Sequence, residues 1–425
     1  MNLIESECFK GRSNNGNTGS FTRNRKLNLK TLLVFLTRGV TSSLQRELDL
    51  FHKEIMGSDF NIRAVTKGGF TQARAKLKHE AFIEMNENVL NTFYEQAPYL
   101  TWNGRRLVAA DGTTLVLPKH KTVIEEFGQH SFGPKADRPK SLASVSFLYD
   151  PLNLMTLDAQ VAPYGTSERE LLYQHLEKVK AGDLLLLDRG YPSRGLFFLL
   201  KAKGIEFCVR MKEDWWLPVQ EFRVSGEKQR VVKFKLPKKD KVLLQDYPEM
   251  LGQEISCRLL RVDLENGETE ILCASLVEEN KYTQQDFARL YHHRWNQEEG
   301  YKLFKARVEV ENFSGKTALA IKQDFFAKVF MMSLCAVLAF PIEEKIKKEY
   351  KEDNNAKYKQ KINRTSAFSM LRNISVGLFI KHKIEQAITA FDKIIYNTTE
   401  IIRPNRKNER CKRPKRHYYM NYKPL

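Results

Sequence analysis

Two aspartates stand where a sheet-based active site would need carboxylates. Asp111 directly follows the apolar run 107–110, and Asp188 directly follows the apolar run 184–187. Carboxylates are costly at the ends of buried strands unless they bind something, and open α/β sheets build their sites at such ends. One such aspartate could simply cap a turn through its own backbone. Because each is followed by glycine, at once or after one residue, the pair favours a site.

A third acid, Glu298, comes with a polar and aromatic helical pattern. Helical spacing places six residues of the segment 291–305 in one stripe about 100° wide: Tyr291, Arg294, Glu298, Tyr301, Lys302 and Lys305. The stripe offers a carboxylate for a metal ion, cations for phosphates and rings that could stack on bases. The alternative is a solvated helix face held by i,i+4 ion pairs. Aromatic residues are costly on a purely solvated face, which favours the binding interpretation.

The overall charge narrows the class of partner. The chain has 70 Lys and Arg against 51 Asp and Glu, and the resulting net charge of +19 is spread over much of its length. Such a field attracts polyanions, which means nucleic acid or an anionic membrane surface. A basic protein without an anionic partner is the alternative.

Composition favours a nucleic acid inside a cell over a membrane. The most apolar run, 329–342, is shorter than the roughly 20 residues that a bilayer requires. The polar, basic N-terminus does not fit a signal peptide. The six cysteines are scattered without a C-x-x-C pair, which argues against a zinc module and fits a reducing cytoplasm.

The elements that must position these residues begin with a helical region. Residues 1–26 are polar and glycine-rich, which predicts a disordered leader. Residues 27–100 carry apolar positions at helical spacing, and we expect one helix to begin after Ser42. The region is interpreted as a helical DNA-binding domain.

One segment of this region is both helical and basic. Around residues 70–78 the apolar positions share one face, which leaves Arg74, Lys76 and Lys78 to point outward. A basic helix in a small helical domain suggests helix-turn-helix DNA binding. An ordinary helical bundle with solvated lysines is an equal alternative.

The remaining chain predicts an α/β core with an interruption. Residues 101–214 contain runs in the order β-β-β-α-β-α-β, which describes a mixed sheet covered by helices. Short alternating strands over 215–282, including KVLLQD, indicate a β-rich insertion. Helical periodicity returns over 283–342, with one helix expected from Thr283 to about Arg307. Residues 343–425 are basic, with intermittent helix and a basic tail.

These motifs resemble those of a known family. The pattern Tyr-x2-Arg-x3-Glu-x6-Lys, carried by Tyr291, Arg294, Glu298 and Lys305, resembles the signature of DDE transposases from the "IS-four" group of bacterial insertion sequences. The ADGT and LLLLDRGY segments resemble the two catalytic aspartate blocks of that family. The segments VTKGGFTQARAKLKHEAF and ENFSGKTALAIKQDFFA also resemble family sequence, so the resemblance covers about residues 27–340.

The resemblance implies a fold, a metal site and roles for named residues. The fold would be an RNase H-like core with Asp111 on the first strand, Asp188 on the fourth and Glu298 on a helix after the β-rich insertion. These acids would hold two Mg²⁺ or Mn²⁺ ions, because hard cations prefer carboxylate oxygens. Arg294 and Lys305 would hold phosphates, and Tyr291 would fix the DNA backbone.

Other DNA-binding candidates come with open alternatives. Trp295 could stack on an unpaired base or simply pack a helix. Arg210 could reach DNA or form a surface salt bridge. Lys302, together with Arg74 and Lys76 of the N-terminal region, completes the set of expected DNA contacts.

The sequence therefore predicts a bacterial transposase that cuts insertion-sequence ends and joins them to target DNA. Its partners would be double-stranded DNA, with terminal inverted repeats and a target, and a second copy in a DNA-bound homodimer. It would act in the cytoplasm at the nucleoid. Phe368, Met370, Leu371, Ile374 and Val376 are the candidate dimer contact, or else a small satellite core. The alternatives are a metal-dependent nuclease of the same fold and an inactive, transposase-derived DNA-binding protein.

Overall fold

The computed structural model of the chain divides into two compact units. The first comprises Met1–Ala97, Leu115–Ala143 and Tyr301–Leu425, and the second comprises Pro98–Thr114 and Ser144–Gly300. The structure describes every residue except 1, 17–19, 22–24, 134–138, 213, 264–266, 353–357, 404–417, 419–422 and 424–425. It also leaves undescribed the side chains of Asn2, Trp295, Gln297, Glu298, Glu299, Lys351 and Glu352.

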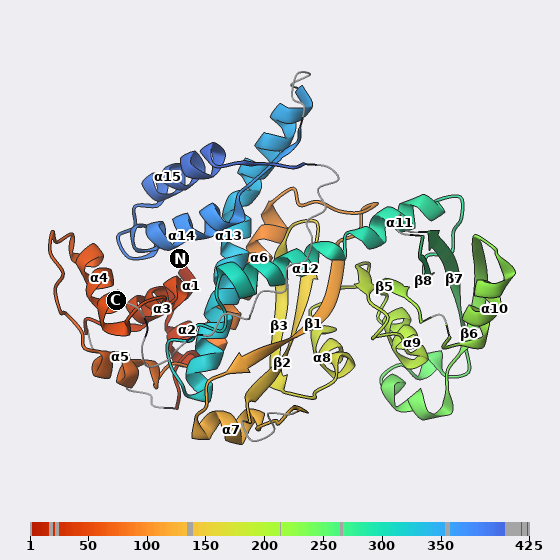
Figure 1. The fold of residues 1–425 in the computed structure, drawn as a ribbon, viewed down its shortest axis with the longest axis horizontal. Helices are drawn as coiled ribbons and strands as arrows, with labels where there is room; N and C mark the ends of the chain where they lie inside the picture. Colours follow the sequence, from red (N-terminus) through yellow and green to blue (C-terminus); the bar gives the residue numbers. More distant parts are fainter. Residues whose placement is uncertain are drawn as a thin grey trace. The chain divides into compact units, whose positions relative to one another are not determined.

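One eight-stranded mixed sheet frames the second unit (Figure 1). Its strands lie in the order β3 (Met155–Pro163), β2 (Ser141–Asp150), β1 (Leu107–Leu117), β4 (Leu184–Leu187), β5 (Glu206–Arg210), β8 (Thr269–Ala274), β7 (Glu254–Asp263) and β6 (Gln229–Lys235). The three central strands β1, β4 and β5 are parallel, whereas β8, β7 and β6 are antiparallel to their neighbours. The predicted mixed sheet is confirmed.

The sequence of the central strands explains their position. All four residues of β4 are leucines, and all four are fully buried. A strand that is apolar at every position suits the middle of a parallel sheet, where both faces are covered. β2 then turns into β3 at Asp150, whose Oδ1 accepts hydrogen bonds from the backbone amides of Leu152 and Asn153, both at 3.0 Å. This is the turn that Asp150 and the following proline indicate in the sequence.

Short capped helices accompany the sheet. α8 (Glu168–His175) begins with a capping box, in which Ser167 Oγ accepts from the Glu170 amide and the Glu170 carboxylate accepts from the Ser167 amide. α9 (Arg194–Ala202) begins after Ser193, whose hydroxyl accepts from the Leu196 amide at 3.1 Å. Both helices lie where the apolar pattern predicts them.

The β-rich insertion differs from its prediction. β6, β7 and β8 extend the core sheet beyond β5 instead of forming a separate structure. The segment KVLLQD, predicted as a strand, lies mostly in a 3-10 helix, Lys238–Leu244. Asp240 at the start of that helix accepts from the Gly195 amide at 3.2 Å, so a contact distant in sequence fixes the segment. A further helix, α10 (Leu217–Ser225), precedes β6.

The helix expected over 283–307 is broken into three pieces. α11 (Gln284–His292) ends at a turn, α12 (Trp295–Lys302) follows it, and Leu303–Arg307 form a π-helical turn. The six residues between Tyr291 and Lys305 therefore do not all lie on one face of a single regular helix, as a constant 100° per residue predicted. The boundary between the compact units also falls inside it, after Gly300.

The first unit is built from helices. They are α1 (Asn2–Glu5), α2 (Glu7–Arg12), α3 (Leu29–Arg38), α4 (Leu44–Met56), α5 (Lys67–Arg74), α6 (Glu80–Gln96), α7 (Lys121–Phe127), α13 (Ala318–Glu352), α14 (Arg364–Phe379) and α15 (Ile384–Asn397). The short strands β9 (Gln360–Lys361) and β10 (Glu400–Ile401) pair antiparallel. α4 begins after Ser43, one residue later than the sequence predicts.

The predicted disordered leader is wrong for much of its length. α1 and α2 are helical, and Phe9 of α2 is fully buried. Ser6 caps α2 by accepting from the Phe9 amide at 3.2 Å, and the Lys78 amide donates to the Ser13 carbonyl at 2.8 Å. A single buried aromatic residue anchors the polar segment, and a composition-based prediction does not detect such an anchor.

The long helix α13 passes through the core of the first unit. By length and composition it is the one helix in the described ranges that could cross a membrane, yet 83% of its most apolar window is buried inside the structure. Such burial is typical of a core helix. Four of the expected dimer-contact residues, Phe368, Leu371, Ile374 and Val376, are buried in the same unit. Of the two alternatives that the sequence leaves open, their burial favours the satellite core.

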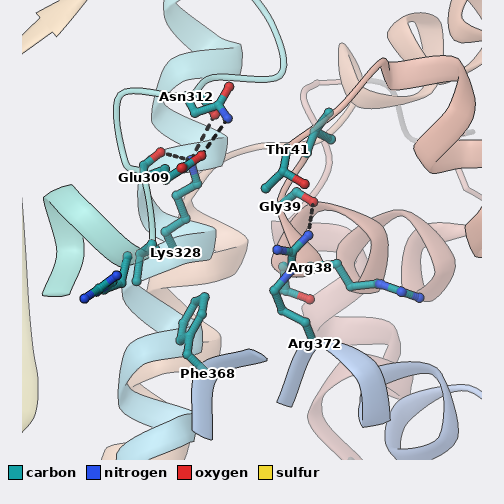
Figure 2. A pocket seen from close by; sticks show the side chains of 12 residues that line it. Arg38, Gly39, Thr41, Glu309, Asn312, Lys328, Phe368 and Arg372 are labelled. Carbon is teal, nitrogen blue, oxygen red and sulfur yellow. Dashed lines mark hydrogen bonds between the residues drawn. The ribbon is translucent and has the colours of Figure 1, made fainter. Parts of the chain in front are cut away.

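Cations gather around a pocket of this unit (Figure 2). It is lined by Arg38, Arg307, Lys328 and Arg372, among others. Lys328 Nζ donates to the carbonyls of Glu309, Asn312 and Val310 at 2.9, 3.1 and 3.4 Å. These carbonyls satisfy the three donors of the ammonium group. Burial nevertheless lowers the pKa of Lys328 to about 8.

Candidate active site

The pairing of β1 with β4 places the two predicted aspartates side by side. Leu107, Val108 and Ala109 pair with Leu184, Leu185 and Leu186 in parallel register. Asp111 lies on β1 two residues after Ala109, and Asp188 directly follows the last residue of β4, close enough for its charge to act on Asp111. The sequence prediction treats Asp111 as the end of its strand, but β1 continues to Leu117. Asp111 instead lies where β1 extends beyond its pairing with β4.

A buried hydrogen-bond chain holds the backbone of Asp111. Ser146 Oγ donates to the Asp111 carbonyl at 3.1 Å, and His175 Nε2 lies 3.0 Å from Ser146 Oγ. His175 Nδ1 lies 2.7 Å from the carboxylate of Asp158, and the histidine is fully buried. The chain links β2, β3 and α8 to the peptide of the first aspartate. Such support keeps a site residue in one orientation.

Tyr291 and Arg294 hold the second aspartate and the space beside it. Tyr291 Oη donates to the Leu187 carbonyl at 3.3 Å and to Asp188 Oδ1 at 3.4 Å. Arg294 lies over the ring of Tyr291, 5.6 Å from its centroid. Only 4% of Tyr291 and 5% of Arg294 is exposed. The described contacts of both side chains lie within the site, and their contacts with DNA stay a prediction. The α11–α12 turn carries both inward.

The sequence analysis missed an acid that the structure brings to this place. The carboxylate of Glu168, the first residue of α8, lies against the two glycines that follow the aspartates. A Cβ added to Gly112 would lie 2.5 Å from Glu168 Oε1, and one added to Gly190 would lie 3.2 Å from Oε2. Glu168 follows a loop and belongs to no apolar run, so only its position as the first residue of a capped helix marks it in the sequence.

Burial and like charge raise the pKa of Asp111 and of Glu168. The pKa of Asp111 is raised to about 6, mainly by burial and further by the charges of Glu168 and Asp188. The Gly112 amide, which donates to Asp111 Oδ1 at 2.9 Å, and the nearby Arg294 act in the opposite direction. Burial and Asp188 also raise the pKa of Glu168. Carboxylates that repel one another form a place where a cation is favoured.

The residues fit a divalent metal ion by chemistry. The donors are all carboxylate oxygens, which suit Mg²⁺ and Mn²⁺. Within the described part of the chain, no three His, Cys, Asp or Glu side chains form a metal centre by themselves. Glu298 lies on α12, as its motif predicts, but its side chain is outside the described residues.

Two other expected DNA contacts form ion pairs within the fold. Arg210 forms an ion pair with Glu270 at 2.9 Å, which is the salt bridge that the sequence leaves open. Arg74 is 5% exposed and pairs with Asp324 at 3.0 Å. It also donates to Gln323 Oε1, Ser314 Oγ and the Ala320 carbonyl. Its partners lie about 250 residues away in sequence, so helical periodicity could not reveal that this cation points inward.

Three of the expected DNA contacts are lysines of the first unit. Lys76 and Lys302 are exposed, and Lys305, in the π-helical turn, is partly exposed. Their accessibility is compatible with DNA contact. The side chain of Trp295 is outside the described residues.

Comparisons with known proteins find a matching family and similar proteins. Residues 102–335 match the family described as the transposase DDE domain. Over 254 residues the chain is 26% identical to Transposase InsG for insertion sequence element IS4 of Escherichia coli (strain K12), which covers 58% of this chain and 54% of that protein. The chain thus spans about half the length of this relative. A solved piggyBac transposase synaptic complex with hairpin DNA is similar with a TM-score of 0.44 and 9% identity, over 92% of this chain and 81% of that chain.

The fold gives the structural class of the protein, and the family match then gives its family. The mixed sheet has the order β3-β2-β1-β4-β5 with β1, β4 and β5 parallel, one aspartate on β1 and the other directly after β4, and it fits the RNase H-like core that the sequence predicts. The family match covers more than half of the chain and includes both aspartates and Glu298. The chain belongs to the family of transposase DDE domains.

Proposed function

We propose that this chain is a transposase that cuts DNA at the ends of an insertion sequence and joins the freed 3′ ends to target DNA. The observation that carries the proposal is the placement of Asp111 beside Asp188 on paired parallel strands of a DDE domain. Asp111 lies on β1 and Asp188 directly after β4, so the sheet limits the movement of both backbones. A site for phosphodiester chemistry needs such preorganisation.

In this proposal Asp111, Asp188 and Glu298 hold two divalent metal ions, Mg²⁺ or Mn²⁺. When bound, these ions lower the pKa of the attacking water or hydroxyl and neutralise charge on the leaving oxygen. Arg294 offsets part of the negative charge beside Asp111, and Tyr291 orients Asp188 through its hydroxyl. Arg294 is also proposed to hold a phosphate and Tyr291 to fix the DNA backbone near the cleavage point.

Double-stranded DNA is the proposed substrate, both as terminal inverted repeats and as target. The net charge of +19 supports a polyanionic partner. Exposed Lys76 and Lys302, together with Lys305, are the proposed phosphate contacts, and Trp295 is a proposed base contact. Cutting and joining two ends calls for two copies of the chain, so the active complex is proposed to be a DNA-bound homodimer in the bacterial cytoplasm, at the nucleoid.

A cleavage and strand-transfer assay tests the proposal. The purified chain is incubated with Mg²⁺ or Mn²⁺, a duplex carrying the flanking inverted repeat and a plasmid target. We expect cleaved ends and joined products from the wild type. Asp188→Asn should lower both by roughly 1,000-fold, because several kcal/mol of transition-state stabilisation is lost. The exposed Asp246→Asn is the matched control, and end-DNA binding in EDTA should be unchanged in both variants.

Two results would redirect the proposal. Cleavage without joined products would indicate a metal-dependent nuclease of the same fold. Binding of the repeat without any cleavage in either metal would indicate an inactive, transposase-derived DNA-binding protein.

A further inference from the structure

The glycines after the two aspartates have no backbone reason to be glycine. Neither Gly112 nor Gly190 has a positive φ, so an L side chain could adopt either backbone conformation. What excludes a side chain is the carboxylate of Glu168. A Cβ on Gly112 would lie 2.5 Å from its Oε1, 2.9 Å from its Cγ and 3.0 Å from its Cδ.

One carboxyl group therefore contacts both aspartate-bearing segments. Glu168 Oε1 faces the residue after Asp111, and Oε2 faces the second residue after Asp188. Its position is fixed by the capping box of α8, which sets the first turn of that helix. The far end of α8 holds His175, which supports the Asp111 backbone through Ser146. Both ends of one short helix thus act on the same strand.

We propose that Glu168 is a positioning residue of the metal site, which spaces the Asp111 and Asp188 segments and adds negative charge that favours a divalent cation between them. This inference rests on the proposed function. Glu168 acts through the two aspartates and their glycines, and the aspartates remain the ligands. Residues that orient metal ligands typically change metal affinity by about 10–100-fold when replaced.

The experiment measures Mn²⁺ binding by the full chain without DNA, using calorimetric titration, and compares Glu168→Gln with the wild type. The glutamine keeps the size of the side chain and removes its charge. We expect Mn²⁺ affinity to fall about 10–100-fold, while end-DNA binding in EDTA stays within error and the melting temperature does not fall. The matched control is Glu177→Gln, an exposed acid just after the same helix.

A second arm tests the steric part with a double-mutant cycle. Gly112→Ala should displace the flexible end of Glu168 and weaken Mn²⁺ binding in the same direction. In a Glu168→Ala background the added methyl meets no carboxylate, so Gly112→Ala should then have little further effect. Gly377→Ala is the control, since a Cβ there meets nothing within 4 Å.

The outcomes separate this inference from the proposed function. If the wild type binds Mn²⁺ and Asp188→Asn does not, but Glu168→Gln binds like the wild type, the positioning role is overturned alone. If the wild type and Asp188→Asn bind Mn²⁺ equally, the proposed metal site fails and the role of Glu168 fails with it. A Glu168→Gln protein that melts early without altered Mn²⁺ affinity would make Glu168 a residue of the fold only.

Discussion

Two buried charged residues of this chain have opposite surroundings, Arg74 in the first unit and Asp111 in the second. In the first unit, Arg74 pairs with Asp324 and donates to three further groups. In the second unit, Asp111 faces two other acids, Glu168 and Asp188. A buried charge with complementary partners stabilises the fold, whereas a buried charge that faces like charge stores instability at a site. The second arrangement is typical of function.

The largest effect that would test this comparison is expected at Arg74. Arg74→Ala should lower the free energy of unfolding by about 3–5 kcal/mol, because Asp324 is left as a buried charge without its main partner. Urea titration measures the loss. Lys76→Ala, an exposed change two residues away, should stay within about 0.5 kcal/mol. If Arg74→Ala and Lys76→Ala lost the same free energy of unfolding, the buried ion pair of Arg74 would not stabilise the fold.

A pH-dependent effect is expected at Lys328. Its pKa in the folded state is lowered to about 8 from an ordinary 10.5. Between these values the folded protein has released a proton that the unfolded chain still holds, so stability rises with pH. Relative to Lys328→Met, we expect the wild type to gain about 2 kcal/mol between pH 8 and pH 9.5. Parallel pH profiles for the two proteins would contradict the lowered pKa.

An effect of opposite sign is expected at Asp111. Its pKa is raised to about 6, so above that pH the folded protein carries a charge that the unfolded chain accommodates more easily. Without metal at pH 7.5, Asp111→Asn should therefore raise the free energy of unfolding by about 1–3 kcal/mol. The gain should shrink as the pH falls from 6 toward 4. A loss of stability at pH 7.5 would show that Asp111 belongs with Arg74 and not with the site.

The smallest effect concerns the surface. Lys76→Ala should leave stability unchanged and reduce the slope of log affinity for end DNA against log salt by about one unit. Arg74→Lys provides the contrast, because a buried side chain makes no phosphate contact. Filter binding over a range of salt concentrations measures both slopes. An unchanged slope for Lys76→Ala would leave this lysine as a solvated charge.

Short sequence patterns predict the strands, turns and helix caps of this molecule that depend on neighbouring residues. The four leucines of β4, the aspartates after the apolar runs, and the caps at Ser193 and Thr283 all follow from short stretches of sequence. The mixed sheet follows as well, because strand signals and helix signals alternate.

The features that short sequence patterns did not predict depend on contacts between residues far apart in the sequence. Arg74 points inward, where it pairs with Asp324. The break between α11 and α12 lies next to Tyr291 and Arg294, whose side chains are buried. Glu168 reaches the site only because the β2–β3 hairpin returns α8 to the strands that carry the aspartates. None of these residues carries a periodic signal of its inward role, since periodicity reports one element at a time.

The spacing of two residues on α8 limits where homologues can gain or lose residues. Glu168 and His175 are seven residues apart, which is two helical turns, so both project from the same side of the helix. An insertion or deletion of one residue between them would rotate one relative to the other by about 100°. Homologues that keep both residues should therefore vary in length in the loop before Ser167 and not within the helix.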